Sequence, residues 1–305
     1  MAQEINSLDG AAQWLNSEPL TGSGLRGNLV LVQFWTYTCI NWIRTLPYVR
    51  AWAERYGRHG LVVVGVHAPE FPFERDLDNV RDAARDMRVE YPLAIDNEFG
   101  IWSAFGNRFW PALYFVDAEG TIRHHHFGEG EYESSEQVLR QLLTKAGAAD
   151  VGSELVSVVG EEVEAAPDWS SIRSPETYLG MGAPRNFAAE ALRLNDWTLS
   201  GEWNTAHQAA MLTGAQGRIA YRFHARDLHL VMGPAERGTS VPFRVLVDGQ
   251  APDVDHGVDV DEEGGGEVTQ QRLYQLIRQR GPVRERTFEI TFLAPGVEAY
   301  AFTFG

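Results

Sequence analysis

The first half of the chain alternates unbroken apolar runs with stretches in which apolar residues recur every three or four positions. The unbroken runs occupy residues 29–35 (LVLVQFW) and 61–66 (LVVVGV). Runs of this kind are typical of parallel strands that are covered on both faces, so both segments are predicted as such strands. A helical stripe extends from Ile43 to Tyr56 between them. The same spacing predicts helices over residues 8–17, 73–88 and 134–145.

Two further runs in this half are expected to pair with each other. Residues 112–117 (ALYFVD) and 121–127 (TIRHHHF) flank the tripeptide AEG, which is typical of a hairpin turn. Residues 1–147 are therefore predicted to form one mixed α/β domain, with parallel strands first and an antiparallel pair at its end.

The second half of the chain has a different pattern. Four short segments place an apolar residue at every second position: residues 219–223, 243–247, 288–292 and 300–304. A period of two with one apolar face is typical of an antiparallel sheet. Glycine and proline turns separate the segments, so an all-β sandwich or jelly roll is predicted.

An acidic stretch separates the two halves. Between Lys145 and Arg173 there is no basic residue, and alanine, glycine and serine are frequent. A single core stops growing at roughly 250–300 residues, so a chain of 305 residues is expected to hold two domains. We expect a mixed α/β domain at 1–147, a solvated linker at 148–175 and a β-sandwich domain at 176–305.

Charge and composition exclude several classes of protein. The net charge of −16 repels phosphate backbones, which argues against nucleic-acid binding. No window approaches about 20 consecutive apolar residues, so no membrane insertion is expected. The first residues, MAQEINSLDGAAQWL, lack the basic and apolar regions of a signal peptide, so a cytoplasmic protein is predicted.

No metal or cofactor is expected. With one cysteine, the chain can form neither an intrachain disulfide nor a thiolate-rich metal site. The triplet His124-His125-His126 lies on a predicted strand, where only His124 and His126 share a face. Since no third or fourth ligand of zinc type is nearby in the sequence, the triplet is predicted as a solvated strand face.

Cys39 is the residue with the clearest chemical potential. It follows the strand at 29–35 and precedes a helix that begins near Asn41. The unpaired N–H groups and the positive end of a helix dipole favour the thiolate over the thiol, which would make Cys39 a nucleophile. A buried, inert cysteine is the alternative reading of the same position.

Two prolines sharpen this interpretation. Pro47 falls within the predicted helix after Cys39, where a proline is costly unless a kink is needed. Pro111 directly precedes the strand at 112–117. A proline that opens a strand suits a cis peptide bond, and we expect the Trp110–Pro111 bond to be cis and to lie beside Cys39.

The segment FWTYTCINW (residues 34–42) resembles the WxxxCxxC segment of thioredoxin-like proteins of the TlpA type. Trp35, Cys39 and Pro47 fall on family positions, and Pro111 matches the family's cis-proline. More narrowly, the chain resembles the soluble C-terminal part of the DipZ proteins. The matching stretches are FWTYTCIN, GVHAPEF (65–71), NRFWPALYFVDAEG (107–120), FGEG (127–130), SPETYLG (174–180) and the terminal FTFG.

The resemblance implies a thioredoxin fold followed by a small β-sandwich that is similar to a carbohydrate-binding module. It also implies a membrane-embedded electron donor and an extracytoplasmic setting. A substrate groove around Cys39 is expected on the same grounds and from the position of the residues along the chain. Its predicted residues are Trp35, Asn41, Trp42, His67, Glu70, Trp110 and Pro111.

One departure from the family changes the expected chemistry. Trp42 stands where the second cysteine of the motif belongs, and no other cysteine can resolve a mixed disulfide. We therefore expect a monothiol oxidoreductase, in which Cys39 forms a mixed disulfide or a sulfenic acid that an external thiol resolves. Its partners would be protein or low-molecular-weight thiols and disulfides.

Two alternatives remain open. The first is a non-catalytic scaffold in which the thioredoxin domain only binds. The second is a one-cysteine peroxidase, because Thr36 lies three residues before Cys39 as in peroxiredoxins, although Val32 replaces the proline of that motif. For the second domain we expect either a carbohydrate, stacked on Trp197 and Trp203, or a protein as the ligand.

Overall fold

The computed structural model describes residues 5–180, 184, 192–206 and 208–305. The chain forms two compact units, Met1–Ala165 and Ala166–Gly305. The expected domain boundaries at residues 147 and 175 stay a prediction.

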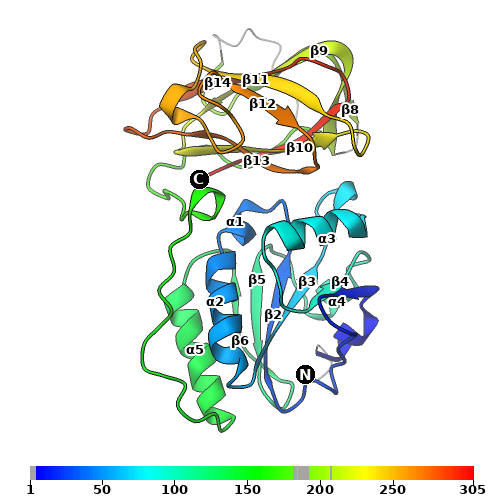
Figure 1. The fold of residues 1–305 in the computed structure, drawn as a ribbon, viewed down its shortest axis with the longest axis vertical. Helices are drawn as coiled ribbons and strands as arrows, with labels where there is room; N and C mark the ends of the chain where they lie inside the picture. Colours follow the sequence, from blue (N-terminus) through cyan, green and yellow to red (C-terminus); the bar gives the residue numbers. More distant parts are fainter. Residues whose placement is uncertain (1–4, 181–183, 185–191, 207) are drawn as a thin grey trace. The chain divides into compact units, whose positions relative to one another are not determined.

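The first unit is built on a mixed sheet of six strands in the order β1-β4-β3-β2-β5-β6 (Figure 1). Strands β2, β3 and β4 run parallel, while β1, β5 and β6 pair antiparallel with their neighbours. This is the predicted thioredoxin-type arrangement. The strands are β1 (Gln13–Leu15), β2 (Leu29–Trp35), β3 (Leu61–His67), β4 (Leu93–Ile95), β5 (Ala112–Val116) and β6 (Ile122–Phe127).

Helices cover both faces of this sheet. The α-helices are α1 (Ile40–Ile43), α2 (Leu46–Gly57), α3 (Leu77–Asp86), α4 (Gly100–Ala104) and α5 (Tyr132–Lys145). Short 3₁₀ helices are η1 (Ile5–Gly10), η2 (Pro72–Arg75) and η3 (Glu162–Glu164). On one face, Val30, Val32 and Phe34 of β2 pack in a core with η1 and α4. On the other face, Gln33 donates from its side chain to Thr45, just before α2, at 2.9 Å.

Helices α2 and α5 lie side by side (Figure 1) and are joined by a buried carboxylate. Glu136 of α5 accepts hydrogen bonds from Trp52 Nε1 at 3.1 Å and from the Tyr56 hydroxyl, both on α2. The same carboxylate accepts from the backbone N–H of Val156 at 2.9 Å. Part of the stretch expected to be a solvated linker is therefore held against the first unit, and Glu164 adds an ion pair to Arg50 at 2.7 Å.

Two expectations about the first unit were wrong. The helix predicted over 8–17 is instead η1 followed by the strand β1, which pairs with β4. The backbone N–H of Ala12 donates to Ile95 at 2.9 Å, so the chain satisfies its hydrogen bonds across the sheet rather than within a helix. Pro47 does not kink a helix interior: it is the second residue of α2, where a helix needs no N–H from it.

The second unit is an antiparallel sheet of nine strands among the described residues, and it is the predicted β-sandwich. Phe288, Ile290 and Phe292 alternate into its core and are fully buried. Between them, Glu289 faces outward and pairs with Arg218 at 2.8 Å. The strands are β7 (Thr177–Tyr178), β8 (Trp197–Ala206), β9 (Ala209–Phe223), β10 (Asp227–Pro234), β11 (Val241–Val247), β12 (Gly265–Val268), β13 (Arg272–Arg278), β14 (Arg286–Phe292) and β15 (Val297–Phe304).

Candidate functional site

Cys39 lies at the point where β2 leaves the sheet and α1 begins. It occupies the N-cap position of α1, with φ −75° and ψ 109°. Its carbonyl accepts from Ile43 N–H at 3.0 Å, and its own N–H donates to Thr36 at 3.3 Å. The residue is half-buried. The thiol is thus held at the start of a helix, where the backbone favours negative charge.

The Trp110–Pro111 turn meets this thiol. Strand β5 pairs with β2 up to Phe34 opposite Ala112, so the preceding Pro111 lies near the end of β2. The Trp110–Pro111 peptide bond is cis. Cys39 Sγ donates to the Trp110 carbonyl oxygen at 3.8 Å. Because only the protonated thiol can donate, this contact favours the thiol and opposes the helix start, which favours the thiolate.

Two stacked indoles lie behind Cys39. Trp42 and Trp35 are both fully buried, with ring centroids 4.4 Å apart and an interplanar angle of 28°. Trp42 therefore fills the interior at the motif position of a second cysteine. Gly65 of β3 makes room for this pair, since a Cβ there would lie 2.9 Å from Trp35 Nε1 and 2.6 Å from Leu93 Cδ2.

His67 extends the aromatic cluster from the end of β3. Its ring meets the edge of Trp35, with centroids 4.9 Å apart, and the residue is fully buried. Neither ring nitrogen has a hydrogen-bond partner among the residues that the structure describes. Burial lowers the pKa of His67 to about 3. The imidazole is therefore neutral at physiological pH and is a weak proton acceptor.

Glu74, on η2, is a buried carboxyl that sequence reasoning missed. Its side chain accepts from the Thr38 hydroxyl at 2.6 Å and from the backbone N–H groups of Glu70 at 2.5 Å and Phe71 at 2.9 Å. Burial raises the pKa of Glu74, although the hydrogen bonds to Thr38 and to the backbone oppose that rise. Glu74 thereby ties the turn that carries Cys39 to the loop after β3. The sequence pattern over 73–88 predicted only a helix, so it gave no sign of this buried carboxyl.

A buried ion pair is the second feature that the sequence did not predict. Arg44 Nη1 lies 3.1 Å from Glu129 Oε1, and their side chains are only 2% and 4% exposed. Burial raises the pKa of Glu129, with Arg44 acting in the opposite direction. Glu129 belongs to the FGEG stretch, which entered the sequence analysis only through its resemblance to a family motif.

The predicted groove residues fall into two groups. Trp35, Trp42 and His67 are fully buried and support the Cys39 turn from inside, and Pro111 is also buried. Three others keep partial exposure on the rim: Asn41 on α1, Glu70 after β3, and Trp110, whose Nε1 donates to the Ala68 carbonyl at 3.0 Å. Contact with substrate by any of these residues stays a prediction.

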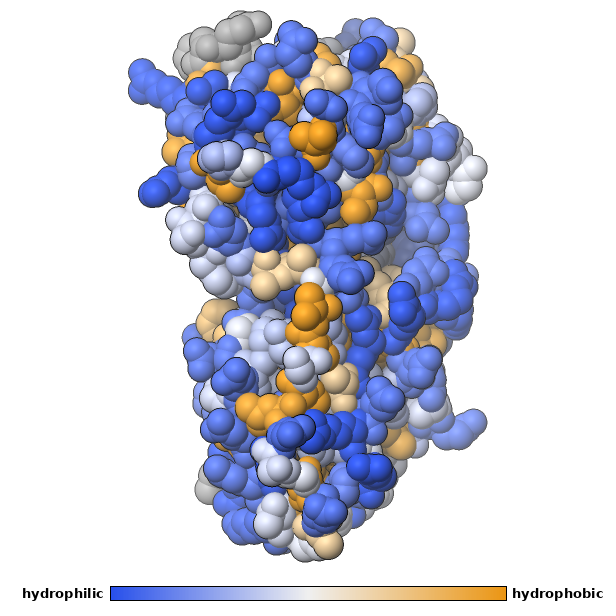
Figure 2. Space-filling view, turned by 60° about the vertical axis from the view of Figure 1, so that its left-hand side comes forward, coloured by the Kyte–Doolittle hydropathy of each residue, from blue (hydrophilic) through white to orange (hydrophobic). Residues whose placement is uncertain are grey.

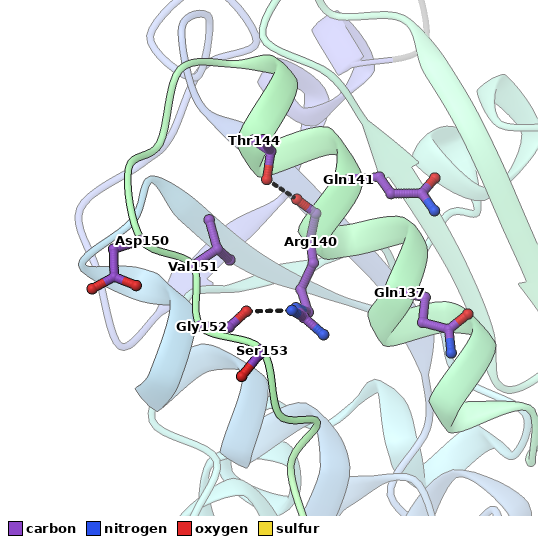
Figure 3. A pocket seen from close by; sticks show the side chains of 8 residues that line it. All are labelled: Gln137, Arg140, Gln141, Thr144, Asp150, Val151, Gly152 and Ser153. Carbon is purple, nitrogen blue, oxygen red and sulfur yellow. Dashed lines mark hydrogen bonds between the residues drawn. The ribbon is translucent and has the colours of Figure 1, made fainter.

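A polar pocket lies elsewhere on the first unit, between the C-terminal half of α5 and residues 150–153 (Figure 3). Arg140 points across it and donates to the Gly152 carbonyl, while the Thr144 hydroxyl donates to the Arg140 carbonyl at 2.9 Å. None of the predicted site residues lines this pocket. Its polar contacts serve to hold residues 150–153 against α5.

The aromatic residues expected to stack on sugar rings are packed in the second unit. Trp197 is 5% exposed and belongs to the core of the sheet. Trp203 is partly buried against that core. Its ring meets that of Phe292 in a T-shaped arrangement with centroids 6.0 Å apart, and its Nε1 donates to the Ser200 carbonyl at 3.0 Å. Stacking by these tryptophans therefore has no support in the structure.

The histidine triplet of the sequence lies on β6. Along β6, His125 is exposed while His124 and His126 are half-buried. Within the described ranges, no group of three or more histidine, cysteine, aspartate or glutamate side chains could hold a metal ion. None of the helices described has both the length and the apolar composition to cross a bilayer. Figure 2 shows small hydrophobic spots scattered over a largely hydrophilic face.

Both halves of the chain match known families. Residues 8–125 match the AhpC/TSA family, and residues 174–305 match the family described as the thioredoxin-like C-terminal domain. The protein DipZ of Mycobacterium bovis is 35% identical over 266 residues, which cover 76% of this chain. The chain spans 37% of the length of DipZ.

Smaller proteins match the first unit. The thiol-disulfide oxidoreductase YkuV of Bacillus subtilis is 26% identical over 145 residues, covering 48% of this chain and 97% of YkuV. The solution structure of a thioredoxin-like protein in its oxidized form is 27% identical, covers 46% of this chain and 95% of that chain, and has a TM-score of 0.43.

Proposed function

We propose a monothiol reaction at Cys39, on the premise that the chain belongs to the thioredoxin-like family of thiol-disulfide oxidoreductases. One observation carries the proposal: the chain's only thiol lies at a helix start and contacts the Trp110 carbonyl oxygen. The position of a resolving cysteine is meanwhile filled by the buried Trp42. The reaction must therefore begin at Cys39 and end with a thiol from outside the chain.

The chemistry proceeds in two exchanges. The Cys39 thiolate attacks one sulfur of a substrate disulfide, forming a new S–S bond as the substrate bond breaks. The departing sulfur leaves as a thiolate and takes a proton from solvent. A low-molecular-weight thiol then attacks the mixed disulfide, and Cys39 leaves as a thiolate. The net reaction leaves one substrate sulfur as a thiol and the other in a disulfide with the external thiol, and it regenerates Cys39.

The Trp110 carbonyl is proposed to serve both states of the thiol. In the resting protein it accepts from Cys39 Sγ. When Cys39 ionises, that hydrogen bond is lost and the carbonyl becomes available to an N–H of the substrate backbone. Pro111 has no N–H of its own to offer at this turn. Substrate binding and ionisation of the thiol would thus reinforce each other.

The direct test compares wild type with Cys39→Ser in oxidised glutathione. Mass spectrometry of the intact wild-type chain should show one glutathione adduct, which reduced glutathione removes, and Cys39→Ser should show none. If the wild-type thiol reacts no faster with disulfides than a free thiol at neutral pH, turnover is absent and the scaffold alternative holds.

A one-cysteine peroxidase is the second candidate, favoured by the match of residues 8–125 to the AhpC/TSA family. In that reaction the thiolate attacks a peroxide oxygen, the O–O bond breaks, and water or an alcohol leaves as Cys39 becomes a sulfenic acid. Trapping of a sulfenic acid by dimedone after brief exposure to hydrogen peroxide would detect it. A rate with peroxide well above the rate with disulfides would make this candidate the better one.

The proposal extends to the ligand of the second unit and to the cellular compartment. A protein, rather than a sugar, is the ligand we propose for the second unit, because Trp197 is buried in its core. That the protein acts in the cytoplasm stays a prediction. Fractionation of cells that express the protein would test it.

A further inference from the structure

A closed ring of contacts joins Cys39 to the Trp110–Pro111 turn by two routes. The short route is the contact of 3.8 Å from Cys39 Sγ to the Trp110 carbonyl. The long route begins at Arg44, at the other end of α1. One helical turn after Cys39, the N–H of Arg44 donates to the Ile40 carbonyl at 3.1 Å, so Arg44 moves with the helix that carries the thiol.

The long route closes through the FGEG loop. Arg44 pairs with Glu129 at 3.1 Å, and the neighbouring Gly128 donates its N–H to the Pro111 carbonyl at 2.8 Å. Gly128 and Gly130, on either side of Glu129, have φ of +84° and +94°. Only glycine adopts such angles easily, so the pair of glycines gives the loop the shape that points Glu129 at Arg44.

Burial makes this ion pair sensitive to the loss of either partner. With side chains 2% and 4% exposed, removal of one charge leaves the other in a poorly solvated site. The pair therefore holds a single geometry rather than exchanging partners as a surface pair does. A fixed Arg44–Glu129 distance in turn fixes the spacing between α1 and the Pro111 turn.

We propose that Arg44 and Glu129 are positioning residues that set the contact between the Cys39 thiol and the Trp110 carbonyl, and thereby the reactivity of Cys39. Neither residue touches the thiol in this scheme; both act through the elements that carry it. The inference rests on the proposed function, since it assumes that Cys39 is the reacting group.

Loss of the Glu129 charge has two expected effects on the thiol. The Trp110 carbonyl, no longer held in place, stops favouring the protonated form. The unpaired cation of Arg44, at the C-cap of the helix that Cys39 begins, favours the thiolate. Both effects lower the midpoint of the pH profile for alkylation. The less ordered groove, in contrast, slows reaction with a disulfide, which needs an aligned approach.

The experiment measures two rates in the full-length chain: alkylation by iodoacetamide across pH, and reaction with oxidised glutathione at neutral pH. The variant is Glu129→Gln, and Glu129→Asp, which keeps the charge, should restore the wild-type profile in part. Glu164→Gln is the matched control, because it breaks the ion pair between Glu164 and Arg50. The side chains of Arg50 and Glu164 are 28% and 24% exposed, so this pair is much less buried than the pair of Arg44 and Glu129. Unfolding midpoints are recorded for every variant.

For Glu129→Gln we expect the alkylation midpoint to fall by about half a pH unit or more and the glutathione rate to fall roughly tenfold. Glu164→Gln should match wild type in both. Unchanged rates in folded Glu129→Gln overturn the positioning role while leaving the proposed function intact. If Glu129→Gln does not fold, Glu129→Asp decides: a partial shift of both rates in the same directions supports the positioning role, and two rates equal to wild type overturn it. A wild-type thiol that is inert to both reagents overturns the proposed function itself.

Discussion

Two buried carboxylates next to arginines, Asp227 in the second unit and Glu129 in the first, have pKa values that are shifted in opposite directions. In the second unit, fully buried Asp227 is held between Arg278 and Arg226, both at 2.6 Å. Burial acts to raise the pKa of Asp227, yet the two arginines lower it below its ordinary value. In the first unit, burial outweighs the partners and raises the pKa of Glu129 and of Glu74.

The difference separates a structural ion pair from carboxyls that are connected to the turn that carries Cys39. For Asp227, the two arginines lower the pKa by more than burial raises it, which suits a group that only has to stay ionised. Glu74 and Glu129 are under-compensated, and each is connected to the Cys39 turn, through Thr38 and through Arg44 respectively. Perturbed carboxyls of this second kind gather at functional sites. The comparison predicts that substitutions in the two units will have separable effects on stability and on thiol chemistry.

The largest expected effect on stability comes from Asp227→Asn. It leaves two arginines with reduced compensation in a buried site, which should cost about 3–5 kcal/mol in the free energy of unfolding. Urea unfolding measures that loss. Under conditions in which the variant remains folded, the rate of Cys39 alkylation should equal that of wild type. A shift in the alkylation profile would mean that the two units are not chemically separate.

Trp42→Cys should change both properties at once. Removing the indole that stacks on Trp35 leaves a cavity, at a cost of about 3 kcal/mol in the reduced protein. The two thiols would stand in CxxC spacing at the start of α1, so an intrachain disulfide should form under oxidising conditions and raise insulin reduction above wild type. Paired thiols that refuse to oxidise would show that the Cys39 turn differs from that of a dithiol thioredoxin.

His67→Phe should flatten the dependence of stability on pH. The folded pKa of His67 is lowered to about 3, while an unfolded histidine titrates near ~6.5. The unfolded state therefore takes up the proton first as the pH falls. The stability that depends on a neutral His67 is complete above about pH 6.5 and is lost as the pH falls towards 3. By pH ~5 the loss amounts to about 2 kcal/mol in the free energy of unfolding.

The test compares unfolding free energies at neutral pH and at pH ~5 in wild type and variant. Phenylalanine keeps the aromatic packing beside Trp35 and removes the titrating group, so the variant should lose less stability on acidification. Equal losses in the two proteins would place the pH dependence elsewhere, for example at the other histidines.

Limited proteolysis should have the smallest effect on either unit. The structure holds Val156 and Glu164 against the first unit, while Trp169 is 63% exposed just beyond the boundary at Ala165. A protease that cuts after aromatic residues should therefore cleave first at Trp169 and leave two folded fragments. First cleavage within residues 150–160, or fragments that aggregate at once, would argue against this division of the chain.

The sequence pattern predicted the parts of the fold that depend on continuous local signals. Unbroken runs marked β2, β3 and β5, and alternation marked the sandwich. The Cys39 turn and Pro111 were predicted as neighbours because Pro111 opens a strand and matches the cis-proline of the family that the chain resembles. The short strand β1 was missed, since three residues carry no period and owe their conformation to pairing with β4.

Glu74 and Glu129 could not be found in the same way. Each lies in a stretch that is polar in sequence, and each has a partner in a distant segment, Thr38 for Glu74 and Arg44 for Glu129. A charged residue gives no local sign that it will be enclosed. For Glu129, the two flanking glycines were the one available signal, because they indicate a constrained loop rather than a solvated helix start.

The proposed function requires a reactive Cys39, and the pH profile of its alkylation tests this in one measurement. The rate of reaction of wild-type protein with iodoacetamide, followed by mass spectrometry from about pH 5 to 10, should rise with a midpoint below that of a free thiol, near ~8.5. Such a result would mean that the helix start outweighs the contact with the Trp110 carbonyl. A midpoint at or above the free-thiol value would contradict the claim that Cys39 is an activated nucleophile.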